Sequence, residues 1–255
     1  MNKRRSHFVD MRMEPDSKGR VRIMATGDWH LGSLNCDEDR VRRDLQRAID
    51  NNWYVICMGD QLETATKSSP GSGVFEQDEP DEQINRIVEL LKPVADAGLL
   101  IGIHHGNHEN RIVNLAGVNV TKMVCRILGC KYLNHAAMHN WKVGKQSYTA
   151  YSTHGSSGSR LPWTKVKAAI DCFRFVDAEL VLYAHTHGLD HATQLYQRVD
   201  KKNRKVEHGI RHAVLTGSYL RYPGSYAEQK NYPPVPMGCA LITLFADHHE
   251  IRVTL

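Results

Sequence analysis

The chain lacks the sequence features that mark membrane proteins, secreted proteins and disulfide-rich proteins. Its apolar runs are far shorter than the roughly 18 residues that a membrane-spanning helix needs, and the longest, such as residues 99–103, are the size of a strand. Residues 1–10 are basic and polar, and no apolar segment behind them indicates a secretory signal. The six cysteines form neither a CxxC pair nor a disulfide-framework spacing. We therefore expect a cytoplasmic protein with reduced thiols and no membrane partner.

A strong excess of one charge is also missing, whereas histidine is abundant. The net charge of +5 only mildly favours acidic partners such as nucleic acid. The 255 residues include 15 histidines, where an average usage of about 2% would give roughly five. Histidine is the commonest nitrogen ligand of metals and the usual acid–base side chain near neutral pH. The placement of the histidines is therefore the first lead to function.

Apolar runs that end in glycine-led turns alternate with helical segments in the first half of the chain. Residues 21–26 and 53–58 predict buried strands, and residues 37–51 between them predict a helix with acidic residues at its start. A second helix over residues 81–97 leads to a third strand over residues 99–103. Such β-α-β crossovers predict a parallel sheet.

The second half of the chain is richer in strand patterns. Its expected elements are a hairpin over residues 141–153, a helix over residues 165–176, a buried strand over residues 179–184, and mostly antiparallel strands over residues 192–219 and 238–255. The sequence has no internal repeat and no linker long enough to divide domains. We therefore expect an α/β fold in which residues 1–255 form a single domain.

Five short polar motifs follow the predicted strands. They lie at residues 27–30, 59–60, 106–109, 153–155 and 185–188. Because ligands bind beyond the carboxyl ends of the strands in an α/β sheet, we expect these loops to gather on one rim. The pairs Asp28/His30 and His185/His187 are spaced i,i+2, which on an extended backbone turns both side chains to one side. Oxygen and imidazole donors without thiolate suit Mn, Fe or Zn, and Asp60 can bridge two ions about 3.5–4 Å apart.

In this order the motifs resemble the signature of the calcineurin-like metallophosphoesterases, which is DxH, GD, GNH[DE], H and GHxH. The resemblance implies a four-layer αββα sandwich of two mixed sheets flanked by helices, and two divalent ions, with Mn ahead of Fe or Zn. It implies that Asp28, His30, Asp60 and His187 hold one ion, and that Asp60, Asn107, His154 and His185 hold the other. It also makes His108 the proton donor to the leaving oxygen rather than a ligand.

Departures from the signature make protein phosphatase activity a poor expectation. His105 stands where the protein phosphatases of this superfamily carry arginine, and the continuation GDxxDRG is absent after Asp60. Ala184 replaces the glycine before the HxH pair, which we expect to alter only the turn. The chain looks like the small stand-alone prokaryotic or phage-type branch related to double-strand-break repair nucleases, without their separate capping domain.

We expect a phosphodiesterase or nuclease that acts on nucleic acid or nucleotides by in-line attack of a metal-bridging hydroxide. Two alternatives stay open. One is a phosphomonoesterase or cyclic-nucleotide phosphodiesterase, and the other is a non-catalytic interaction module of the same fold.

Several residues outside the signature are weaker candidates. Arg111 and Arg160 lie close in sequence to His108 and His154, so either can hold a phosphate oxygen, and His105 is a further substrate-binding candidate. The basic residues Lys201, Lys202, Arg204 and Lys205 predict a hairpin tip, where contact with nucleic acid is an alternative to a plain solvated turn. His104 is expected to support the site together with His105. The histidines without ligand spacing are expected at the surface, namely His7, His135, His139, His191, His208, His212, His248 and His249.

Overall fold

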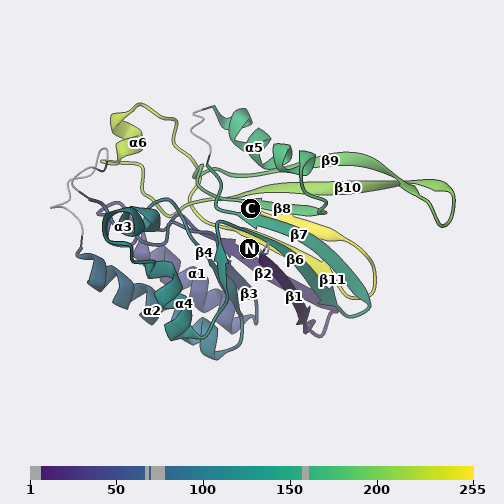
Figure 1. The fold of residues 1–255 in the computed structure, drawn as a ribbon, viewed down its shortest axis with the longest axis horizontal. Coiled ribbons are helices and arrows are strands. Elements are labelled where there is room, and N and C mark those ends of the chain that lie inside the picture. The colour runs from purple at the N-terminus through teal and green to yellow at the C-terminus, as the bar shows by residue number, and fades with distance from the viewer. Residues whose placement is uncertain (1–6, 67–68, 70–77, 157–160) are drawn as a thin grey trace, which may run out of the picture.

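Two six-stranded mixed sheets pack face to face, with helices on both outer faces (Figure 1). The computed structural model describes residues 7–66, 69, 78–156 and 161–255. Within this part of the chain, each helix is too short or too polar to cross a membrane. The predicted α/β class and the four-layer αββα arrangement are confirmed.

Sheet 1 contains the parallel core that the first half of the sequence predicts. Its strand order is β12-β11-β2-β3-β4-β5, in which β2 to β5 run parallel and β11 is antiparallel to both of its neighbours. The bounds are Arg20–Thr26 for β2, Tyr54–Cys57 for β3, Leu100–His104 for β4, Tyr132–Asn134 for β5, Ala240–Phe245 for β11 and Ile251–Thr254 for β12. The antiparallel strands predicted over residues 238–255 are thus the β11–β12 pair.

Sheet 2 carries most of the second half of the chain. Its order is β1-β6-β7-β8-β10-β9, with antiparallel pairing in β6–β7 and β9–β10 and parallel pairing elsewhere. The bounds are His7–Met13 for β1, Ala136–Val143 for β6, Gln146–Thr153 for β7, Leu180–Tyr183 for β8, Leu189–Asp200 for β9 and Lys205–Thr216 for β10. The hairpin predicted over residues 141–153 is the β6–β7 pair, whose first strand begins earlier, at Ala136.

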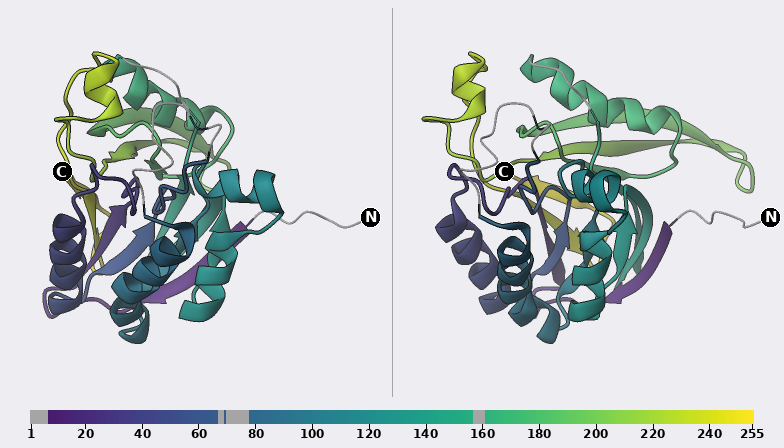
Figure 2. Two further views of the ribbon diagram at one scale, coloured as in Figure 1. Left: turned by 90° about the vertical axis from the view of Figure 1, so that its left-hand side faces the viewer. Right: turned by 60° about the vertical axis from the view of Figure 1, so that its left-hand side comes forward.

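Amphipathic helices cover the outside of each sheet. Helices α1 (Glu38–Asp50), α2 (Pro80–Asp96) and α4 (Val120–Leu128) bury their apolar faces against sheet 1, and α5 (Pro162–Asp171) packs on β8, β9 and β10 of sheet 2 (Figure 2). The start of α1 shows the local cause, because the side chain of Asp37 accepts the backbone N–H of Arg40 and so caps the helix. Three short helices complete the described fold, namely α3 (Glu109–Ala116), the 3-10 helix η1 (Cys172–Arg174) and α6 (Tyr226–Gln229).

The main core lies between the two sheets. Ile23 and Ile242 from sheet 1 face Trp141, Leu182 and Val214 from sheet 2, and all five side chains are fully buried. Burying one large apolar side chain contributes about 1.5–3 kcal/mol, so this layer fixes how the two sheets sit on each other. The ends of β2, β3, β4, β7 and β8 are therefore held at one rim by a packed core.

Five elements were not predicted from the sequence. They are the strands β1 and β5 and the helices α3, α4 and α6. Strand β1 mixes polar and apolar residues, of which Val9 and Met13 are buried against the core, while its remaining side chains are mostly exposed. It forms only because β6 offers a parallel neighbour from far along the chain, a partner that local periodicity cannot reveal.

Candidate metal centre

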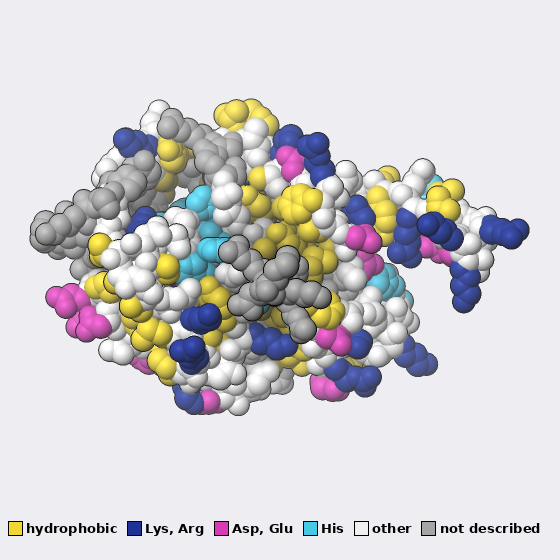
Figure 3. All heavy atoms as spheres, viewed as in Figure 1, with side chains coloured by type: hydrophobic (Ala, Val, Ile, Leu, Met, Phe, Trp, Pro, Cys, Tyr) yellow, Lys and Arg dark blue, Asp and Glu magenta, His cyan; other side chains and the backbone are white. Residues whose placement is uncertain are grey.

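Loops from both sheets meet at one rim of the sandwich. The backbone N–H of Asp28 donates to the carbonyl of Gly59 at 2.9 Å, and that of His30 donates to the carbonyl of Asp60 at 3.0 Å. The backbone N–H of His185, which follows β8, donates to Oδ2 of Asp28 at 3.0 Å. These bonds tie the loops of sheet 1 to each other and to sheet 2. Figure 3 shows histidine side chains gathered between α3 and α5.

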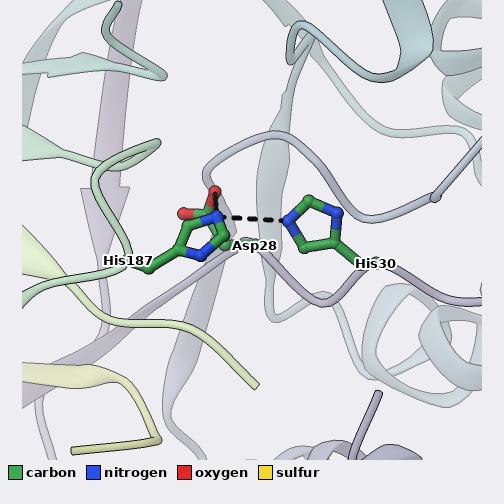
Figure 4. Close-up of side chains that lie close together, drawn as sticks. All are labelled: Asp28, His30 and His187. Carbon is green, nitrogen blue, oxygen red and sulfur yellow. Dashed lines mark hydrogen bonds and ion pairs between the residues drawn. The ribbon is translucent and has the colours of Figure 1, made fainter. Parts of the chain in front are cut away.

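Asp28, His30 and His187 form a first group of candidate ligands. One donor atom from each lies within 4.8 Å of the other two. Nε2 of His187 lies 3.3 Å from Nε2 of His30 and 3.4 Å from Oδ1 of Asp28 (Figure 4). Two imidazole nitrogens that face each other beside a buried carboxylate are arranged to share a cation.

Asp60, His154 and His185 form a second group by the same 4.8 Å criterion. Nε2 of His154 lies 3.3 Å from Oδ2 of Asp60 and 2.9 Å from Oδ1 of Asn107. The same Asn107 oxygen lies 2.7 Å from Nδ1 of His185. The structure therefore brings Asn107 into the second group, as a neutral oxygen donor.

Asp60 stands between the two groups. Its carboxylate belongs to the second group and also to a third cluster with His30 and His108. Oδ1 of Asp60 accepts the backbone N–H of His108 at 2.9 Å, while Oδ2 faces His154. One carboxylate thus has its two oxygens close to both sets of imidazoles, which is the placement that a bridging ligand requires.

The backbone of the ligand loops differs from the prediction. An extended chain was expected to turn the i,i+2 pairs to one side, and this is wrong. Asp28 and His30 have φ of 50° and 54°, and His185 and His187 have φ of 65° and 54°. Asp60 has φ of 52°. Left-handed conformations of non-glycine residues cost on the order of 1–3 kcal/mol each and cluster at functional sites, so tight turns rather than a β pleat aim these side chains.

The outer nitrogens of two histidines are fixed by hydrogen bonds. Nδ1 of His30 lies 2.9 Å from Oε2 of Glu63, and Nδ1 of His154 lies 3.0 Å from the carbonyl oxygen of Met58. Each acceptor holds the ring proton on Nδ1, which leaves Nε2 free to act as a donor atom toward the two groups. Partners of this kind orient metal-binding histidines and strengthen them as ligands.

The carboxylate of Asp28 is incompletely satisfied inside the first group. The side chain is fully buried, and its Oδ1 makes no hydrogen bond with a described residue, only the 3.4 Å ion-pair contact with Nε2 of His187. Leaving a buried polar atom without a hydrogen bond costs about 1–3 kcal/mol. A divalent cation would satisfy this oxygen together with the neighbouring imidazoles, and the donor set, free of thiolate, suits Mn, Fe or Zn. The residues therefore fit metal ions.

The ionisation of Asp28 and Asp60 also favours bound cations. Burial alone raises the pKa of a carboxyl group, yet His187 brings the pKa of Asp28 below its usual value, and His154 and His108 bring that of Asp60 well below it. Burial lowers the pKa of His154, but the carboxylate of Asp60 outweighs this and raises it to about 10. The two aspartates are thus ionised and draw positive charge to themselves.

Glu109 holds the loops together, a role that the sequence did not reveal. Its buried carboxylate accepts the backbone N–H groups of Asp60, Leu62 and Gly106 at 3.2, 3.0 and 3.0 Å. Burial and the charge of Asp60 raise its pKa to about 7. Gly106 is required beside it, since a Cβ there would lie 2.1 Å from Oδ1 of Asp60.

Glu63 is a second functional residue that the sequence reasoning missed. Its carboxylate accepts a hydrogen bond from Nδ1 of His30, and its backbone carbonyl lies 2.9 Å from Nδ1 of His108. Arg111 donates to the same carbonyl at 2.9 Å and lies 3.3 Å from Oε1 of Glu63. Its spacing of three residues after Asp60 was the available signal. Glu63 therefore links a candidate ligand to the candidate proton donor.

The three weaker substrate-binding candidates lie in different places. Arg111 reaches the site, where its Nη2 lies 2.9 Å from Nε2 of His108. His105 is 1% exposed, its Nδ1 lies 2.9 Å from Oγ1 of Thr121, and it belongs to none of the three candidate ligand clusters. Arg160 lies outside the described residues.

Comparison with solved structures finds similar folds, with low sequence identity and low TM-scores. No family model matches the chain, and no curated protein matches it. Among solved structures, the chain is similar to the phosphoesterase Yfce from E. coli, with 17% identity, coverage of 92% and 98% of the two chains, and a TM-score of 0.44. It is also similar to a metallophosphoesterase from Sphaerobacter thermophilus, with 14% identity, coverage of 92% and 87%, and a TM-score of 0.38.

A third similar structure is Vps29 complexed with zinc from Entamoeba histolytica, with 13% identity, coverage of 92% and 97%, and a TM-score of 0.37. At such identities and scores the likenesses carry no argument about the reaction. The case for function rests on the side chains described above.

Proposed function

We propose that this protein is a dimetal-dependent phosphoester hydrolase, and more specifically a phosphodiesterase of nucleic acid or nucleotides. The observation that carries the proposal is the arrangement of seven donor residues around one rim, in which Asp60 belongs to the group with His154 and lies within reach of His30 from the other group. Asp28, His30, Asp60 and His187 would hold one ion, and Asp60, Asn107, His154 and His185 the other. Such ions supply Lewis-acid stabilisation of charge on phosphoryl oxygens and make water acidic enough to attack near neutral pH.

The charge balance of the site favours an anionic substrate. Two divalent cations bring four positive charges and the two aspartates two negative ones, while His and Asn ligands are neutral. A net positive centre at the rim attracts a phosphate group. The mild positive charge of the whole chain, +5, supports nucleic acid or nucleotides within this class.

His108 is the proposed proton donor to the leaving oxygen. Its Nδ1 faces the carbonyl of Glu63, so this nitrogen keeps its proton and Nε2 is the nitrogen that exchanges one. Nε2 lies 3.9 Å from Oδ2 of Asp60, next to the shared ligand. Arg111 donates to this nitrogen at 2.9 Å. A substrate phosphate that draws Arg111 to its own oxygens would free Nε2 to carry a proton.

A panel of substrates tests the proposal. Purified protein is reconstituted with Mn²⁺, Fe²⁺ or Zn²⁺ and given bis-p-nitrophenyl phosphate, p-nitrophenyl phosphate, a cyclic nucleotide, and single-stranded and duplex DNA. We expect metal-dependent cleavage of diesters in preference to the monoester. Activity confined to the monoester would overturn the diester assignment, and no hydrolysis of any substrate with any metal would favour a non-catalytic module.

A further inference from the structure

Strands β9 and β10 continue beyond the body of the protein as a long two-stranded arm, defined here as residues 195–210 (Figure 1). The antiparallel register pairs Leu195 with Ile210 and Val199 with Val206. All four of these side chains are exposed, Leu195 by 80%. The arm therefore has no packing partner within the described chain, although at its base β10 is buried and β9 is half-buried.

The tip of the arm carries cations without carboxylate partners. Lys201, Lys202 and Arg204 are exposed, and none of them is in an ion pair with a described residue. The two acids of the arm are already engaged. Asp200 accepts the backbone N–H groups of Lys202 and Asn203 and so closes the turn, and Glu207 pairs with Arg198 at 2.9 Å. Figure 3 shows the resulting Lys and Arg side chains (dark blue) at the projecting end.

The arm is an ordered ribbon. The ring of Tyr196 lies over Gly209, where a Cβ would come within 2.4 Å of the ring. The guanidinium of Arg211 lies 4.2 Å from the centre of the same ring and is anchored by Asp177 at 3.0 Å. A fixed ribbon loses little conformational freedom on binding, so its charges act at a defined place.

Both strands of the arm join the candidate metal centre at their base. Strand β9 begins two residues after His187, and beyond β10 the backbone N–H of Tyr219 donates to the carbonyl of Asp28 at 3.1 Å. From Leu189 to Asp200 an extended strand spans about 36 Å, close to one helical turn of B-DNA at about 34–36 Å. A straight duplex with one phosphodiester at the metal centre can thus present another phosphate to the tip.

We propose that the arm binds duplex DNA and that Lys201, Lys202 and Arg204 contact its phosphates about one turn from the metal centre. This inference deepens the proposed function and rests on it for the reaction at the other end. A two-stranded β-ribbon also fits the major groove of B-DNA. Single strands are the poorer fit, because they bind by stacking on aromatic rings and Tyr196, the one aromatic residue of the arm, is covered by Arg211.

A second copy of this chain is the competing occupant. The apolar stripe of Leu195, Val199, Val206 and Ile210 is interrupted in the middle by the polar pair Gln197 and His208. A stable dimer buries about 800 Å² on each partner, more than four such side chains supply, and three unpaired cations at the tip repel their own copies. Charge therefore favours a polyanion over self-association.

The test is a binding experiment in which cleavage cannot occur. Fluorescence anisotropy with a labelled 25-base-pair DNA is measured in EDTA at several salt concentrations. The variant Lys201→Gln/Lys202→Gln/Arg204→Gln is compared with Arg43→Gln/Lys92→Gln/Arg126→Gln, which removes the same charge from exposed positions on helices α1, α2 and α4. Thermal unfolding checks that both variants are folded.

We expect the arm variant to lose roughly 10- to 100-fold in affinity near 0.1 M salt and its slope of log K against log salt to fall by about 2.7, or 0.9 per lost phosphate contact. The helix variant should bind like the wild-type chain. Equal losses in both variants, no binding of duplex by the wild-type chain, or tighter binding of single-stranded DNA or RNA would each overturn the proposal. So would sedimentation showing a dimer that Leu195→Ser abolishes.

Failure of the arm and failure of the proposed reaction have different signatures. Hydrolysis of bis-p-nitrophenyl phosphate by the wild-type chain reports on the metal centre alone, because this diester is too small to reach the tip. Hydrolysis without arm-dependent DNA binding removes the arm proposal only. Arm-dependent binding without hydrolysis of any ester removes the proposed reaction and leaves the arm as a DNA contact.

Discussion

Three buried histidines of this protein differ sharply in pKa, two in the core and one at the rim. His104 and His139 share Oγ of Ser152 at 2.6 and 2.5 Å in the core, and burial lowers the pKa of each to about 3. His154 at the rim is equally buried, but the carboxylate of Asp60 outweighs burial and raises its pKa to about 10. The difference lies in the neighbours, because no ion pair with a described carboxylate reaches the core pair.

The comparison teaches what the rim is built to hold. Burial makes an imidazole neutral unless a nearby anion outweighs the loss of solvent. At the rim Asp28 and Asp60 supply that anion, and they do so inside a packed protein where an uncompensated carboxylate is costly. The core histidines serve packing and hydrogen bonding, whereas the rim histidines surround a place for positive charge.

The largest effect is expected from the carboxylate that both groups share. Asp60→Asn removes the negative charge between them, so we expect both ions to be lost together. Hydrolysis of a diester should fall by about 10⁴-fold or more, because positioning and charge stabilisation are lost at once. Metal content is measured by mass spectrometry beside the exposed variant Asp39→Asn. Loss of only one ion would contradict the shared role.

The next largest effect is expected at the proposed proton donor. His108→Ala should leave both ions in place and lower turnover by roughly 10²–10⁴-fold, the usual worth of general acid catalysis. The loss should be greatest for diesters with a poor leaving group, since p-nitrophenolate leaves without a proton. Unchanged turnover on a poor leaving group would remove His108 from that role.

A smaller effect is expected from the carboxylate behind His30. Glu63→Gln keeps the shape of the side chain but weakens its hold on Nδ1 of His30. Affinity for the ion held by His30 should fall about 10- to 100-fold, while the second ion is bound as before. Titration with Mn²⁺ measures both, and Glu89→Gln on the exposed face of α2 is the control. An equal loss at both sites would show that Glu63 supports the loops in general.

The smallest effect is expected from the core histidine His139, and it appears in how the stability of the protein depends on pH. The folded pKa of His139 is about 3 against 6.5 in the unfolded chain, so the unfolded chain binds the extra proton between these values and stability falls as pH drops below 6.5. From pH 7 to pH 5 this amounts to about 2 kcal/mol. In His139→Gln that contribution should vanish. Urea unfolding at both pH values checks it, and an unchanged pH dependence in the variant would contradict the neutral core histidine.

The sequence was most informative where chemistry and topology coincide. Each predicted ligand follows a predicted strand, and the rule that sites form beyond strand ends was sufficient to expect Asp28, Asp60 and Asn107 near one another. The structure then shows side chains within a few ångströms. Their left-handed backbone was not predicted, because glycine is the residue that signals such turns and the sequence has Asp and His there.

The roles of residues that position other residues could not be predicted from the sequence. Glu63 and Glu109 are ordinary acids by composition, and their roles depend on loops that only the fold brings together. His139 was expected at the surface and is buried, because it lies on the inner face of β6. Strand β1 was missed since its pairing partner is distant in the sequence. Helix α4 could have been found, because Asn119 caps its start and Gly129 ends it.

Anomalous scattering from crystals grown with Mn²⁺ tests the central claim most directly. The account predicts two peaks about 3.5–4 Å apart, one beside Asp28, His30 and His187 and the other beside Asn107, His154 and His185, with the Asp60 carboxylate between them. A single peak at full occupancy, or two peaks of which neither contacts Asp60, would contradict it.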